Sequence, residues 1–305
     1  MNTPEDHAVV MKPADRAPAG RWLAQRSLQP ELMDDPGFAD PVLHAHVLAD
    51  LAEVNRFTRT HEPVLRFLQQ AWQRRPPREA VSVLDVGSGQ GDLLRAIWRL
   101  AWQQGRTVHL QGLDLHPHST QAAQLATPPA MGIRFLTGDV LTHRPAEPVD
   151  YVVSSQLAHH LDDAQLLRLL RWLDRHAAAG WCIADLRRHW LPWLGFRLLA
   201  RLAGWHPVVR IDGTRSIARA CTPAEWQQLL ARAGVAAQVR RHWPFRLTVE
   251  SMQPPGGQAR TEPAPARRRV AGERLAACKP PGRPPTDRQS RLRGGELDRG
   301  AVDAG

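Results

Sequence analysis

The chain has 305 residues, of which 43% are hydrophobic and 23% charged, and no run of about 18 residues lacks polar side chains, so a globular fold without a membrane-spanning helix is expected. Its three cysteines, Cys182, Cys221 and Cys278, form no CxxC pair, which argues against a disulfide framework or a zinc cluster and favours the reducing cytoplasm. The net charge is +10, and residues 251–305 contribute half of it with 11 Lys and Arg against 6 Asp and Glu; because the remainder is spread along the chain, no nucleic-acid partner is expected.

The N-terminal quarter divides into two parts. Residues 1–20 are polar and proline-containing and predict a flexible leader. Residues 21–78 predict a helical cover, because Val47, Leu51 and Val54 recur at helical spacing and a second apolar group follows at 64–68. This cover either packs on the main domain or closes over a pocket as a lid, and one element can do both.

Strands and helices alternate from residue 81 onwards. Strands are expected at 81–86, 108–114, 133–136, 149–154 and 180–185, and helices at 93–102, 119–126 and 162–176. This order predicts an α/β fold with a mostly parallel sheet and helices on both faces. Because ligands of such sheets bind beyond the carboxyl ends of the strands, the residues just after each strand are the candidates for function.

The pattern changes after residue 185. Residues 186–220 are rich in Trp and Arg and predict an inserted helical segment that packs on the sheet, forms a lid over an acceptor pocket, or makes transient contact with a membrane surface. A helix is expected at 223–233, with Thr222 and Glu225 as a capping box, and final strands at 235–239 and 245–249. Residues 252–305 contain few large apolar side chains and predict a disordered tail.

A glycine-rich loop, Gly87-Ser-Gly-Gln-Gly91, follows the first expected strand and opens a helix. Glycine allows the backbone to turn sharply and to approach a ligand closely, and the helix N-terminus offers free N–H groups. The spacing G-x-G-x-G differs from the dinucleotide spacing G-x-G-x-x-G. Asp92 would repel a pyrophosphate and is better suited to face the ammonium group of a methionine moiety.

Acidic residues follow the next two strands. Asp114 ends the second strand, 23 residues after Gly91, close to the ~20 expected for an acid that binds ribose hydroxyls. Asp139 follows the third strand and is able to accept from the amino group of adenine, with Val140 and Leu141 as apolar cover. Each acid alone is an ordinary surface or turn residue, but three signals at three successive strand ends indicate one site for a nucleoside linked to an amino acid.

Four segments, 83–91, Gly112-Leu-Asp-Leu115, Gly138-Asp-Val140 and 154–162, resemble the ordered motifs of class I S-adenosylmethionine methyltransferases. The resemblance covers roughly residues 80–250, places the methyltransferase domain at 79–251, and implies a Rossmann-like sheet of seven strands with the last one antiparallel. It implies S-adenosylmethionine as cofactor, with Asp85 and the glycine loop at the methionine end, Asp114 at the ribose and Asp139 at the adenine. The full set of implied cofactor contacts is Asp85, Gly87, Ser88, Gly89, Gly91, Asp114, Leu115, Asp139, Val140 and Ser155. The segment 212–225 is similar to bacterial small-molecule methyltransferases related to the quinone-biosynthesis group.

Fewer residues are candidates for catalysis and acceptor binding than for cofactor binding. His159 and His160 follow the fourth strand, and either is a possible general base for a hydroxyl acceptor; the alternative is that they support the pocket. Asp185 ends the fifth strand and either lines the acceptor pocket or pairs with a neighbouring arginine. Arg219 is a candidate contact for an acidic acceptor or a surface charge, and no metal is expected.

The predicted function is therefore methyl transfer to a small, apolar or phenolic acceptor by O- or C-methylation in the cytoplasm, with the oligomeric state open. Two alternatives remain at this point. A nicotinamide-dependent oxidoreductase shares the strand order and the ribose acid, although Asp92 and the loop spacing argue against it. A scaffold that binds S-adenosylmethionine without catalysis is the other.

Overall fold

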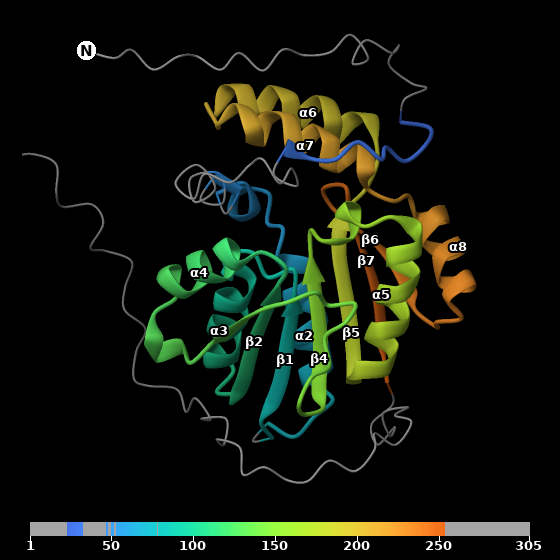
Figure 1. Cartoon of the computed structure of the whole chain (residues 1–305). Helices are drawn as coiled ribbons and strands as arrows, with labels where there is room; N and C mark the ends of the chain where they lie inside the picture. The colour runs from blue at the N-terminus through green and yellow to red at the C-terminus, as the bar shows by residue number, and fades with distance from the viewer. Residues whose placement is uncertain (1–22, 33–46, 48–49, 52, 78, 254–305) are drawn as a thin grey trace, which may run out of the picture.

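One mostly parallel sheet organises the molecule (Figure 1). The computed structural model describes residues 23–32, 47, 50–51, 53–77 and 79–253, so the expected leader and nearly all of the expected tail lie outside the described residues. The strands are β1 Val81–Val86, β2 Val108–Asp114, β3 Arg134–Thr137, β4 Val149–Ser155, β5 Ala177–Leu186, β6 Gln238–His242 and β7 Arg246–Met252. Their order in the sheet is β3-β2-β1-β4-β5-β7-β6, with β7 antiparallel to both of its neighbours. The predicted seven-stranded Rossmann-like sheet is confirmed.

Helices cover both faces of this sheet. The helices on the two faces are α2 Glu62–Trp72, α3 Asp92–Gln103, α4 Pro117–Ala126, α5 Asp163–His176 and α8 Pro223–Ala233, with short 3₁₀ turns η3 Pro129–Met131 and η4 Ala158–His160. Helices α6 Trp190–Leu202 and α7 Pro207–Arg219 lie beyond the carboxyl ends of the strands (Figure 1). Alternate residues of β1 explain the two layers: Val83 packs with α2 and α3, whereas Leu84 packs with α5 and α8. Both layers therefore fix the carboxyl ends of β1 to β5 at one edge.

Most predicted boundaries lie within a few residues of those observed, and the capping residues agree. Asp162 and Thr222 each form a capping box at the start of a helix. The sixth strand is displaced, because it begins at Gln238 rather than at Val235. The amide of Val235 donates to the Leu230 carbonyl and its side chain is buried against the end of α8, so this residue closes the helix. The last strand continues to Met252, one residue beyond the predicted domain boundary.

The N-terminal cover is less helical than predicted and splits between two neighbours. Residues 26–30 are not helical; they run beside α7, where the amide of Ser27 donates to the Ala218 carbonyl. Val47 and Val54 belong to a separate apolar cluster with Ala200 and Trp205 of the α6–α7 region, whereas α2 packs on the sheet. The first part of the cover thus joins the inserted segment 186–220.

Candidate functional site

The glycine loop is fixed at the carboxyl end of β1 by the neighbouring strand. The amides of Gly87 and Ser88 donate to the Leu113 carbonyl at 2.8 and 3.2 Å, and the amide of Gly89 donates to Asp114 Oδ2 at 2.8 Å. Gly87, Gly89 and Gly91 have φ angles of 74°, 51° and 76°, a region that favours glycine. The loop shape therefore depends on these residues.

Gly91 is the most constrained of the three. A Cβ atom at this position would lie 2.7 Å from the ring of Phe135. We expect Gly91→Ala to lower the free energy of unfolding by about 1–2 kcal/mol from the left-handed backbone alone, with the ring contact adding to it. Urea unfolding measures this change. Gly105→Ala is the matched control, because Gly105 also has positive φ but open space around it; equal losses in the two variants would contradict the role of Phe135.

The three motifs at the strand ends lie together, as predicted. Besides the Gly89 contact, Asp114 Oδ1 accepts from the His116 amide at 3.0 Å, and the Asp114 carbonyl accepts from the Gly138 amide at 2.8 Å. Asp139 is exposed and its Oδ1 accepts from the Leu141 amide at 2.8 Å. Leu115 is 60% exposed beside them, and Val140 is half-buried.

Two buried polar atoms face this region without a hydrogen-bond partner among the described residues: Asp85 Oδ1 and Ser155 Oγ. Burial raises the pKa of Asp85 well above its ordinary value, and the nearby Asp92 and Asp114 carboxyl groups add to the shift. Burying polar atoms without partners is costly, so they indicate a place where a ligand completes the hydrogen bonding.

Asp92 connects the glycine loop to the N-terminal cover. Its Oδ2 contacts His61 Nε2 at 2.9 Å and accepts from the Asn55 amide nitrogen at 3.1 Å. That Asp92 faces a ligand ammonium stays a prediction; among the described residues its carboxylate contacts these two side chains. Burial acts to raise the pKa of Asp92, but the hydrogen bonds from His61 and Asn55 prevail and lower it to about 2.

The low pKa of Asp92 predicts a pH dependence of stability. A carboxyl group whose folded pKa lies below its unfolded value stabilises the fold above the unfolded value of about 3.9, and the contribution is lost as pH falls towards 2. We expect Asp92→Asn to remove roughly 2 kcal/mol of this acid-sensitive stability. The measurement is urea unfolding at several pH values from 5 to 2, with Glu147→Gln, an exposed loop residue, as control. Parallel profiles for wild type and Asp92→Asn would contradict the assignment.

His159 forms a buried pair with Asp185. Its Nδ1 lies 2.7 Å from Asp185 Oδ1, and its backbone amide donates to Asp185 Oδ2 at 2.8 Å. Burial acts to raise the pKa of Asp185, but the charge and hydrogen bond of His159 prevail and hold it below the ordinary value. Of the predicted alternatives for Asp185, a pair with Arg188 is wrong, because the guanidinium of Arg188 contacts Glu225 and backbone carbonyls.

Glu31 is a site residue that sequence reasoning missed. It is buried at 5% exposure, with its carboxylate oxygens 3.5 Å from His159 Nε2 and 3.8 Å from His160 Nε2. The ligand atoms of these three residues lie within 4.8 Å of one another. However, Ser216 donates to Glu31 at 2.9 Å and Arg219 Nε lies 4.0 Å away, so the carboxylate already has polar and cationic neighbours. No local signal marks Glu31, because only the path of residues 23–32 along α7 places it here.

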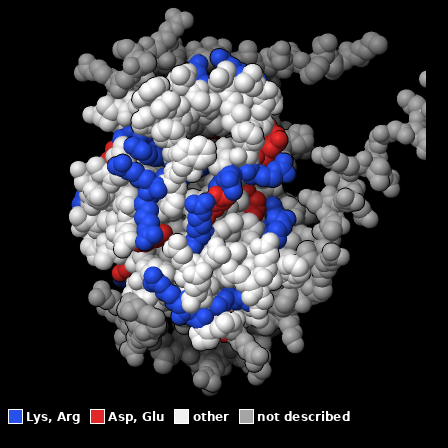
Figure 2. All heavy atoms as spheres, turned by 180° about the vertical axis from the view of Figure 1, so that it is seen from behind, with Lys and Arg blue, Asp and Glu red and all other residues white. Residues whose placement is uncertain are grey.

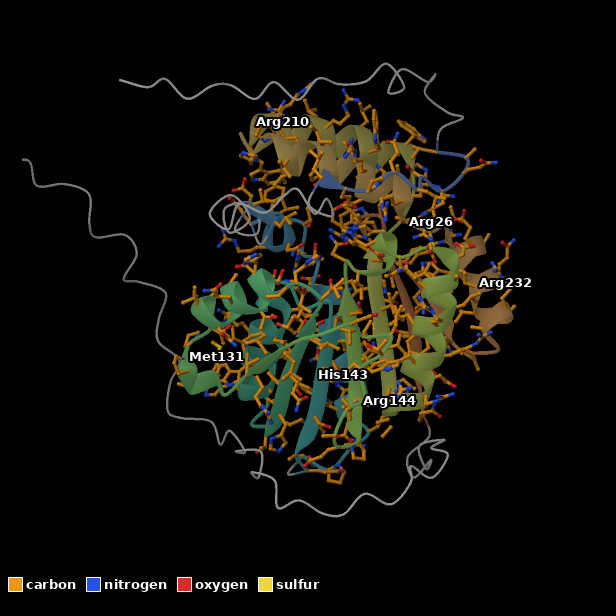
Figure 3. The ribbon with its side chains drawn as sticks, in the orientation of Figure 1. Arg26, Met131, His143, Arg144, Arg210 and Arg232 are labelled. Atoms are coloured by element: carbon orange, nitrogen blue, oxygen red, sulfur yellow. The ribbon has the colours of Figure 1, made fainter. Side chains whose placement is uncertain are left out.

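Arg219 is buried, and its side chain donates hydrogen bonds to backbone carbonyls of the η4 turn. Its guanidinium donates to the carbonyls of His159, His160 and Gln29 at 2.6–2.9 Å. Arg26 lies beside α5 and η4 (Figure 3) and donates to the carbonyls of Ala158 and Leu161. Two arginines from separate segments therefore fix η4, and Arg219 is placed as a structural contact rather than as a predicted surface charge.

Arg246 is a second residue that the sequence did not reveal. It is 6% exposed and donates to Gln156 Oε1 at 3.1 Å and to the hydroxyls of Thr58 and Thr60 at 2.9 and 2.7 Å. Burial lowers the pKa of Arg246 to about 10. Gln156 follows β4 with a φ of 64°. Arg246 of β7 is therefore hydrogen-bonded to two other segments, the residue after β4 and the N-terminal cover.

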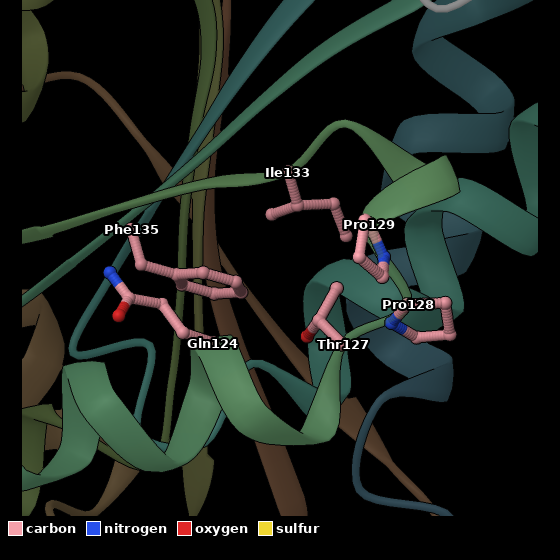
Figure 4. Close-up of a pocket in the computed structure, with 6 residues that line it drawn as sticks. All are labelled: Gln124, Thr127, Pro128, Pro129, Ile133 and Phe135. Carbon is pink, nitrogen blue, oxygen red and sulfur yellow. The ribbon is translucent and has the colours of Figure 1, made fainter.

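A small pocket of about 150 Å³ lies elsewhere, between the end of α4 and the start of β3 (Figure 4). Its lining includes Gln124, Thr127 and Phe135, and it contains no titratable group. It therefore offers no chemistry comparable with that of the strand ends.

Comparisons with known proteins identify the fold. Residues 83–180 match a family model described as a methyltransferase domain. The chain therefore contains a methyltransferase domain, which is consistent with the resemblance to class I S-adenosylmethionine-dependent methyltransferases. A plantazolicin methyltransferase has the same fold, with a TM-score of 0.51 and 15% identity over 70% of this chain and 91% of that one. Human N-acetylserotonin methyltransferase gives a TM-score of 0.50 and 16% identity over 71% of this chain and 57% of that one. A search of curated proteins found no match.

The match to a methyltransferase domain distinguishes between the methyltransferase and the oxidoreductase that the sequence left open. The predicted enzyme class, a methyltransferase that uses S-adenosylmethionine, is confirmed, and the nicotinamide-dependent oxidoreductase is not. The matched residues of the methyltransferase contain the glycine loop, Asp114, Asp139 and both histidines. None of the described helices is long and apolar enough to cross a membrane.

Proposed function

We propose that this methyltransferase transfers the methyl group of S-adenosylmethionine to a hydroxyl of a small, apolar or phenolic acceptor in the cytoplasm. The observation that carries the proposal is the juxtaposition, at one sheet edge, of the glycine loop held by Asp114 and the η4 turn that carries His159 and His160. When bound, S-adenosylmethionine supplies an electrophilic methyl group on a sulfonium sulfur. Similarity to the quinone-biosynthesis group over 212–225 supports an acceptor of this kind.

The residues at the strand ends suit the parts of this cofactor. The buried Oδ1 atom of Asp85, which lacks a partner among the described residues, would accept a hydrogen bond from the ammonium group of the cofactor. The buried Ser155 Oγ also lacks a partner and would offer a second polar contact. The start of α3 would receive the carboxylate, since the amides of Gly87, Ser88 and Gly89 already donate to Leu113 and Asp114. Asp114 would accept from the ribose hydroxyls, Asp139 from the adenine amine, and the exposed Leu115 with Val140 would cover the ring.

Asp114 offers a direct test of the cofactor assignment. We expect Asp114→Ala to weaken S-adenosylmethionine binding by about 1–3 kcal/mol, because the ribose hydroxyls lose their acceptor and the Gly89 amide loses its anchor. Calorimetric titration measures the dissociation constant. Glu147→Ala, an exposed acid before β4, is the control. An unchanged constant in Asp114→Ala would remove this residue from the site.

We assign to His160 the role of taking the proton of the acceptor hydroxyl. Its side chain is 28% exposed, whereas His159 is buried at 3% behind it, with ring centroids 4.3 Å apart. The imidazole of His160 would accept the proton of the acceptor hydroxyl, so that the oxygen becomes the nucleophile for the electrophilic methyl group that the bound cofactor would supply. His159, fixed by Asp185, is a positioning residue in this scheme.

The proposal is tested in two steps. Calorimetry should show binding of S-adenosylmethionine and S-adenosylhomocysteine but not of NAD. Incubation with extract and isotope-labelled S-adenosylmethionine, followed by mass spectrometry, should then reveal a small product that has gained CH2 on oxygen. Binding without any methylated product would favour a non-catalytic scaffold, and a product methylated on carbon or nitrogen would contradict the hydroxyl acceptor.

A further inference from the structure

Helix α6 exposes an apolar surface to solvent. Trp190, Leu191, Leu194, Leu198 and Leu202 are 45–78% exposed. At 100° per residue these five positions fall within an arc of about 120°, so they form one continuous stripe. We call this stripe, with its five residues, the α6 stripe. Scattered exposed leucines are ordinary, but a contiguous apolar stripe on one helix marks an interaction surface.

The opposite side of α6 accounts for the packing of the helix, so the α6 stripe is not needed for the fold. Ala200 is fully buried, and Phe196 packs with Trp205 and with the cluster that includes Val47 and Val54. Helix α6 is therefore apolar on both sides, and α7 covers only the inner one. A surface helix normally places polar residues on its outer side.

The charged residues of the segment that carries the α6 stripe are all of one sign. Asp185 and Asp212 bracket a segment that contains five arginines and no acidic residue. Arg197 and Arg201 are exposed; at 100° per residue Arg197 lies next to the arc of the α6 stripe and Arg201 lies within it. Arg210 lies at the outer end of α7 (Figure 3). In the space-filling view, the upper end of the molecule, where α6 and α7 lie, is mostly white with basic groups near its upper margin (Figure 2).

We propose that the α6 stripe docks on the surface of an anionic phospholipid membrane, with α6 lying in the interface. An apolar side flanked by arginines, with tryptophan at one end, is the composition of interfacial helices. Thirteen residues span only about 20 Å, which suits a helix that lies along a bilayer rather than one that crosses it. The absence of acidic residues in this segment favours an anionic lipid over a second copy of the chain, because two copies would bring like charges together.

The surface is also close to the proposed acceptor site. Helix α7 packs against α6 and ends at Arg219, which donates to the carbonyls of His159 and His160. A membrane-docked α6 would therefore hold η4 near the lipid surface, which suits an acceptor that partitions into membranes. Docking itself does not depend on the proposed methyl transfer.

The test is flotation of the full chain with vesicles of neutral phosphatidylcholine alone or with added phosphatidylglycerol, at low and high salt. Wild type should float with the anionic vesicles, and high salt should reduce binding at least threefold. Leu194→Gln/Leu198→Gln should reduce binding at least tenfold, as should Arg197→Gln/Arg201→Gln. The control is Leu125→Gln, on α4, where Leu125 is 83% exposed but isolated from the α6 stripe.

Three outcomes would overturn the proposal. Wild type that does not float contradicts it, and so does flotation that the leucine variant retains, since binding would then lie elsewhere, for example in residues 253–305. A dimer in light scattering that only the leucine variant abolishes would assign the stripe to a second copy. S-adenosylmethionine affinity, measured on the same variants, should be unchanged; this readout separates failure of docking from failure of the proposed methyl transfer.

Discussion

His160→Ala is expected to lower the rate of methyl transfer by about 10²–10⁴-fold, while the dissociation constant of S-adenosylmethionine stays within about twofold of wild type. The rate falls because the acceptor hydroxyl loses the imidazole that takes its proton. The measurement is single-turnover transfer as a function of pH, with saturating cofactor and an acceptor found by mass spectrometry. Wild type should lose rate as His160 becomes protonated, and the variant should lack that dependence.

The control for this prediction is His116→Ala, an exposed histidine that precedes α4. It should retain the wild-type rate and pH profile. If His160→Ala kept the wild-type profile, the histidine would have no part in proton transfer, and methyl transfer would have to proceed by positioning alone.

Asp185→Ala is expected to lower the free energy of unfolding by about 3–5 kcal/mol at neutral pH. The substitution leaves His159 buried at 3% exposure and removes the acceptor for the amides of His159 and Leu186. Because the folded pKa of Asp185 lies below its unfolded value, its stabilisation is present above about pH 4 and is lost as pH falls further. The difference between wild type and variant should therefore be largest near pH 7 and shrink towards pH 2.

Urea unfolding at these pH values measures both parts of the prediction. Asp185→Asn keeps the shape of the side chain and one acceptor, so it should lose less stability than the alanine variant. Glu147→Ala should lose almost none. If Asp185→Ala lowered the free energy of unfolding by less than about 1 kcal/mol, the pair with His159 would contribute little to the fold. That result would contradict the role of His159 as a positioning residue.

The sequence alone determined the sheet and the meeting of the three motifs at its edge. Apolar runs that stop at Gly87, Asp114 and Asp139 are local signals, and parallel strands necessarily bring their carboxyl ends to one edge, so the three motifs had to meet. The capping box at Thr222 was equally readable, because capping depends on residues three positions apart.

Only the tertiary structure decided the partners of the charged side chains. Asp92 contacts His61 and Asn55 across 31 and 37 positions of the sequence, and Asp185 contacts His159 across 26. Glu31 lies near His159 and His160 across more than 120 positions. These pairs depend on how the N-terminal cover and α7 dock on the strand ends, which no local pattern encodes. The α6 stripe is similar: the segment was predicted to be helical, but both sides of the helix are apolar, and only packing showed which one stays exposed.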